Sequence, residues 1–188
     1  LNAKRDAREG NVVKYKPFTL LHASDLHGVK EQLQRIVDYQ KYYKQFIDSS
    51  IISGDIVLGT FDDDFTFFSD VDGAENIMLS IGNHDTAEEG SPIDWTAHVG
   101  QDSYEKFIKD FASTWGINEV VNKCYYYKDY ADYAIRLIVV DCMENNSQEQ
   151  LTWFENTLNG AKANEYAVVV ITHYSPVRNE LFECSFTS

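Results

Sequence analysis

Four short stretches of this sequence carry side chains that bind metal ions and transfer protons. They are Asp25 with His27, Gly54-Asp55, Gly82-Asn83-His84-Asp85, and His173. Their carboxylate, amide and imidazole groups form a hard to borderline ligand set without a thiolate. Such a set suits Mn, Fe, Zn, Ni or Co better than copper(I) or an iron–sulfur cluster. The residue types therefore favour a divalent metal site, at which a phosphate would bind even on an acidic protein.

Each stretch follows an apolar run that predicts a β-strand. The runs cover residues 18–23, 50–53, 76–81 and 166–171, and the last of them predicts a buried strand. Polar side chains at the carboxyl ends of strands in an open α/β sheet lie where ligands usually bind. Asp25 and His27 are separated by one residue, so on an extended chain both would point to the same side. A plain turn would also accept Gly82-Asn83, and the prediction of a shared site therefore rests on the whole set.

Two further features lie close to these stretches. His22 is inside the first run, and because it precedes the strand end we interpret it as a core or supporting histidine rather than a ligand. Residues 86–100 are irregular, and loops of this length are often functional. Asp94, Trp95 and His98 would contact substrate there, and a plain surface excursion is an equal alternative.

Helical periodicity between the strands predicts an alternating α/β chain. Residues 30–47 place Leu33, Ile36, Val37, Tyr43 and Ile47 on one face. Further helices are predicted at 61–70, from Asp102 or Ser103 to about 111, and from the capping box Ser147–Gln150 to Asn159-Gly160, with Leu151, Phe154 and Leu158 inward. Residues 125–128 and 133–140 read as two strands joined by a short turn. These elements would position the four polar stretches.

Length and composition indicate one ordered domain of 188 residues, with 44% apolar and 14% aromatic side chains. A chain of this length buries about 70% of its unfolded surface. The net charge of −14 disfavours binding to nucleic acids and anionic lipids. Cys124, Cys142 and Cys184 are far apart, so we interpret them as buried free thiols.

Targeting signals are weak. No apolar stretch approaches the roughly 18 residues that a membrane-spanning helix needs. Residues 1–16 read as a flexible lead-in without a signal-peptide pattern, which favours a cytoplasmic location and leaves the compartment and the oligomeric state open.

The ordered motifs Asp-x-His, Gly-Asp, Gly-Asn-His-Asp and a later His resemble those of the calcineurin-like metallophosphoesterase family. The resemblance covers about residues 18–176. It implies a four-layer α/β/β/α sandwich around two mixed sheets, with residues 17–188 as the catalytic domain. It also implies a metal-dependent phosphatase or phosphodiesterase that acts on a phosphoester small molecule or a phosphorylated substrate.

The resemblance further implies a role for each polar residue in a centre of two divalent ions. Asp25 and His27 would bind the first ion, Asp55 would bridge both, and Asn83 and His173 would bind the second. His84 would face the phosphoryl group, and Asp85 would orient His84. A hydroxide bridging the two ions would attack phosphorus, without a covalent enzyme intermediate.

One departure from the family pattern qualifies these expectations. The family usually has a late Gly-His-x-His that completes both metal shells, and nothing after His173 matches it. We therefore favour a C-terminally truncated fragment over a naturally short chain. The same departure supports an alternative, a non-catalytic scaffold on the same fold, whereas the intact motifs from Asp25 to Asp85 argue against it.

Overall fold

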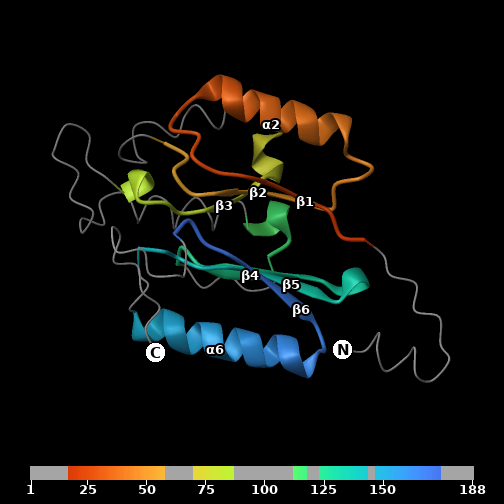
Figure 1. Ribbon diagram of the computed structural model, residues 1–188, viewed down its shortest axis with the longest axis vertical. Helices are drawn as coiled ribbons and strands as arrows, with labels where there is room; N and C mark the ends of the chain where they lie inside the picture. Colours follow the sequence, from red (N-terminus) through yellow and green to blue (C-terminus); the bar gives the residue numbers. More distant parts are fainter. Residues whose placement is uncertain (1–16, 58–69, 87–111, 118–122, 144–146, 175–188) are drawn as a thin grey trace.

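Two β-sheets face each other and are covered on their outer sides by helices. The computed structural model describes residues 17–57, 70–86, 112–117, 123–143 and 147–174. Helix α2 (Lys30–Tyr42) covers the first sheet and helix α6 (Gln148–Ala163) the second, as Figure 1 shows. The layers therefore follow the order α/β/β/α, which confirms the predicted fold class.

The two sheets differ in topology. The first has the order β1-β2-β3, with β1 (Leu20–Ala23), β2 (Ser49–Ser53) and β3 (Met78–Ser80) all parallel. The second has the order β4-β5-β6, with β4 (Tyr126–Tyr130), β5 (Ile135–Val139) and β6 (Ala167–Ile171). Strand β4 is antiparallel to β5, and β6 is parallel to it. Short 3-10 helices lie at Ala74–Asn76, His84–Thr86 and Ala131–Tyr133.

The core extends from α2 through the first sheet to the second sheet and fixes the layers against each other. Buried apolar side chains of β2 and β3 belong to one cluster with Leu137, Val139 and Ile171 of the second sheet. The buried Tyr126 hydroxyl donates across the gap to the Leu79 carbonyl at 2.7 Å. Because burying an unpaired hydroxyl is unfavourable, this bond also specifies how the two sheets face each other.

Helix α2 is shorter than predicted. Leu33 and Val37 are buried as expected, but the helix ends at Tyr42, and Tyr43 is exposed. After the helix the chain turns, with the Phe46 N–H donating to the Tyr43 carbonyl, and reaches β2 within a few residues. Tyr43 and Ile47, which continued the apolar pattern, therefore lie in the connection between α2 and β2 and not in the helix.

Helix α6 begins as predicted but differs at its end and on its buried face. The Ser147 hydroxyl accepts a hydrogen bond from the Gln150 N–H. The Gln150 side-chain amide accepts from the Asp141 N–H and donates to the Asp141 carbonyl. The predicted end at Asn159-Gly160 was wrong, because the helix continues to Ala163. Gln150, Thr157 and Ala161 are its buried residues, and Leu151 is exposed.

The predicted burial of β6 was also wrong, and one of the two alternatives for His22 is excluded. Strand β6 exposes Val168 and Val170, and only Ile171 of this strand is fully buried. His22 is exposed, which excludes the core alternative. Its Nε2 lies 2.7 Å from the Ser53 hydroxyl, which agrees with the alternative of a supporting histidine. Apolar runs do not reveal whether a strand is covered on both faces, because that depends on elements distant in sequence.

The remaining expectations concern thiols, membrane spans and segments outside the described residues. Cys124 and Cys142 are buried thiols that form no disulfide among the described residues, as predicted. None of the described helices is long and apolar enough to cross a membrane. The lead-in 1–16, the loop 87–100, the helix predicted up to 111, most of the helix predicted at 61–70, and Cys184 lie outside the described residues.

Candidate metal centre

The predicted site residues follow the carboxyl ends of four strands. Asp25 and His27 come after β1, Asp55 after β2, Asn83-His84-Asp85 after β3, and His173 after β6 of the other sheet. Three of these strands are parallel neighbours, so their ends lie at the same edge. The structure therefore brings all the predicted positions to one end of the sandwich.

The turns after β1 and β2 are held together by backbone hydrogen bonds. Asp25 N–H donates to the Gly54 carbonyl at 3.1 Å, and His27 N–H donates to the Asp55 carbonyl at 3.0 Å. Asp25, His27 and Asp55 have φ values of 58°, 49° and 53°, in the left-handed region. The extended-chain argument for Asp25 and His27 was therefore wrong. Their side chains still meet, with His27 Nε2 at 3.7 Å from Asp25 Oδ1.

The Asp55 carboxylate is the centre of the constellation. Its Oδ2 lies 3.3 Å from His173 Nε2 and 3.9 Å from His84 Nε2, and its Oδ1 accepts the His84 N–H at 2.9 Å. Asp55, only 3% exposed, belongs to two groups of potential metal ligands whose atoms lie within 4.8 Å of one another. One group contains Asp25, Asp55 and His173, and the other contains His27, Asp55 and His84.

His173 is surrounded by oxygen atoms. Its Nδ1 lies 2.9 Å from the Ser53 carbonyl, and its Nε2 lies 3.1 Å from Asn83 Oδ1 and close to Asp55 Oδ2. A neutral imidazole that donates from Nδ1 to the Ser53 carbonyl has no hydrogen left at Nε2. A positive charge at Nε2, supplied either by protonation or by a metal ion, would satisfy the two oxygens that face it.

The electrostatics of this pair agree with a positive charge at Nε2 of His173. Burial raises the pKa of Asp55, but the hydrogen bond and charge of His173, with help from His84, outweigh it and lower the pKa. Burial lowers the pKa of His173, but Asp55 and the Ser53 carbonyl outweigh it and raise the pKa. The site thus stabilises an anionic Asp55 beside a positive charge.

Asp85 has a different environment from the one predicted. Its fully buried carboxylate accepts hydrogen bonds from Ile56 N–H at 2.8 Å, Val57 N–H at 3.0 Å and Gly82 N–H at 2.8 Å. Burial raises its pKa to about 7, the N–H donors oppose the rise, and the charge of Asp55 adds to it. These three bonds join the turns after β2 and β3.

The donor set fits divalent metal ions. Carboxylate oxygens and imidazole nitrogens converge, and His27 Nδ1 is buried without a hydrogen-bond partner. Borderline divalent ions prefer such mixed O and N ligands. The sequence predicted that Asp25 and His27 bind the same ion. In the structure Asp25 is grouped with His173, and His27 with His84, so this pairing stays a prediction.

Two supporting features were missed from the sequence. The Ser53 carbonyl orients His173, and a backbone acceptor leaves no sequence signal. Gly54 lies so close to the His173 ring that an added Cβ would be 2.5 Å from its Cγ. The Gly-Asp pair after β2 was the available signal, because a glycine there permits both the close approach and φ of +83°.

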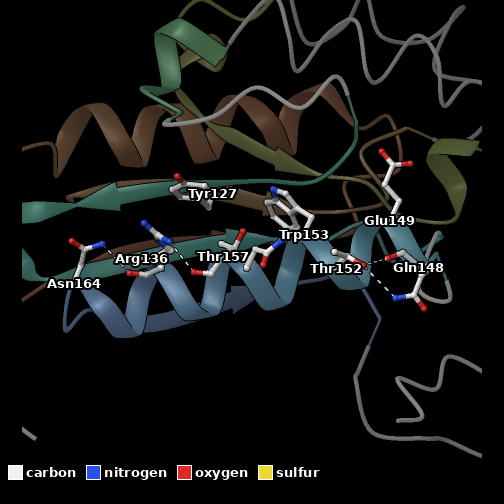
Figure 2. Close-up of a pocket in the computed structure, with 10 residues that line it drawn as sticks. Tyr127, Arg136, Gln148, Glu149, Thr152, Trp153, Thr157 and Asn164 are labelled. Carbon is white, nitrogen blue, oxygen red and sulfur yellow. Dashed lines mark hydrogen bonds between the residues drawn. The ribbon is translucent and has the colours of Figure 1, made fainter.

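A separate groove of about 730 Å³ lies beside α6, and Figure 2 shows its lining. Its walls come from β4, β5 and α6 and include Tyr127, Arg136, Trp153 and Thr157. The lining contains none of the predicted metal ligands. Its one cationic side chain, Arg136, is already engaged by Asp129 and the Thr157 carbonyl.

Comparison with known proteins agrees with the geometry. Residues 18–186 match the calcineurin-like phosphoesterase family, and the match includes every strand of both sheets and every predicted site residue. A search of curated proteins found no match. The chain therefore belongs to the calcineurin-like phosphoesterase family.

Proposed function

We propose that this chain forms the active centre of a phosphoester hydrolase that holds two divalent ions. Family membership and the convergent ligands support metal-dependent phosphoesterase chemistry in general. The two-ion proposal rests mainly on Asp55, whose single carboxylate belongs to both ligand groups. A shared carboxylate between two sets of imidazole and carboxylate ligands suits a pair of ions better than a single ion.

In this proposal the ligands keep their predicted roles. Asp25 and His27 would hold one ion, Asn83 and His173 would hold the other, and both would share Asp55. When bound, such ions activate water and stabilise the charge on phosphoryl oxygens. The chain itself orients these ligands through the Ser53 carbonyl and the paired turns after β1 and β2.

His84 is the residue that we propose for proton transfer. Its side chain is 22% exposed, so it borders the buried Asp55 while remaining accessible to a substrate. Its ring meets the His27 ring edge to face at 4.9 Å, and its backbone N–H is fixed by Asp55 Oδ1. An imidazole held in this way can donate a proton to the departing oxygen.

The substrate class follows only in outline. We propose a phosphoester small molecule or a phosphorylated substrate, with residues 17–188 as the catalytic domain. The net charge of −14 disfavours long polyanions.

The test combines metal content with hydrolysis. The full-length protein is loaded in turn with Mn²⁺, Zn²⁺, Ni²⁺ and Mg²⁺, its bound metal is quantified, and cleavage of p-nitrophenyl phosphate and of its bis-ester is measured. We expect about two ions per chain and metal-dependent cleavage. His84→Ala should lower the rate at least about 100-fold while keeping the metal.

Asp132→Asn, which removes an exposed carboxylate in the 3-10 helix between β4 and β5, provides the control and should leave both quantities unchanged. A protein that binds no metal and cleaves neither ester would instead support the scaffold alternative. Wild-type rates in His84→Ala would remove that residue from the mechanism.

A further inference from the structure

We infer that Asp85 is a positioning residue for the bridging carboxylate of Asp55, not the partner that orients the His84 ring. This inference rests on the proposed function, because it assigns how that centre is held in shape. It depends on four connected observations about the turns that follow β2 and β3.

The first observation is the set of atoms that Asp85 binds. Oδ1 accepts from the N–H groups of Ile56 and Val57, the two residues that directly follow Asp55. Oδ2 accepts from Gly82 N–H in its own turn. One fully buried carboxylate thus joins two neighbouring strand ends through their backbones.

The second observation is that the Asp55 turn needs such support. Gly54 and Asp55 are consecutive left-handed residues, with φ of 83° and 53°. Asp55 has a side chain, and this conformation is unfavourable for most residues that have one. Ile56 and Val57 are completely buried, so their N–H groups would lack acceptors if the Asp85 carboxylate were absent.

The third observation is the close packing of Gly82 against Asp55. A Cβ at Gly82 would lie 2.3 Å from both the backbone nitrogen and Oδ1 of Asp55. The bond from Gly82 N–H to Asp85 Oδ2 holds this glycine in place. Asp85 therefore restrains the Asp55 carboxylate from two sides.

The fourth observation is that the turn after β2 is hydrogen-bonded to the turn after β1, which contains His27. The Asp55 carbonyl accepts from His27 N–H, and the Ile56 carbonyl accepts from Gly28 N–H at 2.9 Å. A shift of this turn would consequently displace both His27 and Asp55, which belong to one ligand group. The positioning role therefore predicts that loss of Asp85 weakens metal binding, whereas orientation of His84 predicts loss of catalysis with metal still bound.

The test compares Asp85→Asn with Asp48→Asn in the full-length protein. The amide introduced by Asp85→Asn would offer one acceptor oxygen and would turn an NH₂ group toward an N–H donor. Asp48 also accepts a backbone N–H, from Thr19 at 2.8 Å, but before β2, at the far end of the strands. We expect Asp85→Asn to weaken Mn²⁺ or Zn²⁺ binding, measured by calorimetry, about 10–100-fold, and Asp48→Asn to leave it unchanged.

Activity at saturating metal and a double variant separate the two roles. In the positioning role, excess metal restores much of the hydrolysis lost in Asp85→Asn. The substitution also weakens metal binding by the same factor in a His84→Ala background. Unchanged metal affinity, combined with no further loss of rate when Asp85→Asn is added to His84→Ala, would overturn the inference.

Amide hydrogen exchange of the metal-free protein gives an independent readout. We expect the Ile56 and Val57 amides to exchange faster in Asp85→Asn, while core amides of β5 keep their protection. Unchanged exchange at Ile56 and Val57 would contradict the inference. If Asp85→Asn does not fold, Asp85→Glu, which keeps the charge but displaces the oxygens, undergoes the same measurements. A wild type without bound metal would remove the proposed function, and the two amides would still decide the role of Asp85.

Discussion

Charged side chains gather around the buried Arg136 and around the buried Asp55, and these two groups differ in how the charge is balanced. In the Arg136 cluster, formed by Tyr127, Asp129, Arg136 and Thr157, the guanidinium meets Asp129 through two bonds of 2.6 and 2.7 Å. Its third nitrogen donates to the Thr157 carbonyl at 2.8 Å, and the Tyr127 ring lies 4.1 Å away (Figure 2). This cluster is complete without a ligand.

The candidate metal centre has the opposite balance. Asp25 and Asp55 face imidazoles rather than a lysine or arginine among the described residues. Three of its residues have left-handed backbone, whereas Asp129 and Arg136 are directly opposed residues on two regular strands. Buried charge that is paired within regular structure indicates a structural role. Buried charge that converges without a permanent counter-ion, on strained turns, indicates a binding site.

The largest effect on stability is expected where the balanced cluster is broken. Asp129→Ala leaves the Arg136 guanidinium, which is 5% exposed, without its carboxylate. We expect a loss of about 3–5 kcal/mol in the free energy of unfolding, measured by urea denaturation. The metal content per folded chain should not change. Loss of metal from a chain that is still folded would contradict the separation of the two regions.

A change in the candidate metal centre is expected to affect metal binding more than the stability of the fold. Asp55→Asn removes the charge shared by the two ligand groups. We expect metal affinity to fall by at least about 100-fold, or about 2.7 kcal/mol, because removing a ligand costs more than removing a residue that supports one. Hydrolysis at limiting metal should fall correspondingly. The melting temperature of the metal-free protein should change by only a few degrees. Calorimetric titration and thermal denaturation provide these two values, and full metal affinity would contradict the bridging role.

The sequence predicted the positions of the site better than its local geometry. Strand ends rich in Asp, Asn and His identified the positions that the structure brings together, because parallel strands end at a common edge. The left-handed backbone of Asp25 and His27 was not predictable from their spacing, since it depends on bonds to the Gly54 and Asp55 carbonyls. The family resemblance assigned Asp85 to His84, yet the partners of Asp85 include residues 28 and 29 positions away.

The limits of the fold prediction have the same cause. The end of α6 was placed at Gly160, but that glycine lies inside the helix, where an added Cβ would be 2.9 Å from Arg136 Nη1. Its small size serves the contact with Arg136, and this contact is invisible in helical periodicity. Exposure of Val168 and Val170 similarly depends on what covers the sheet.

Gly54, beside His173, and Gly160, beside Arg136, allow a smaller and more selective comparison of the two regions. Gly54→Ala places a Cβ at φ of +83° and within 2.6 Å of three His173 atoms. We expect the backbone strain to cost about 1–2 kcal/mol in unfolding free energy. The displaced His173 should also weaken metal binding about tenfold, measured by the same titration. Unchanged metal affinity would mean that the His173 ring adapts without losing its ligand position.

Gly160→Ala is the matched change beside Arg136 and should have the smallest effect. Replacing a helical glycine by alanine stabilises a helix by about 0.8–1 kcal/mol, because it removes backbone freedom from the unfolded chain. The new methyl group would press on the Nη1 atom that bonds the Thr157 carbonyl, which opposes this gain. We therefore expect a net change within about 1 kcal/mol in urea denaturation and unaltered metal affinity. A loss of metal binding here would show that the two regions are coupled through the second sheet.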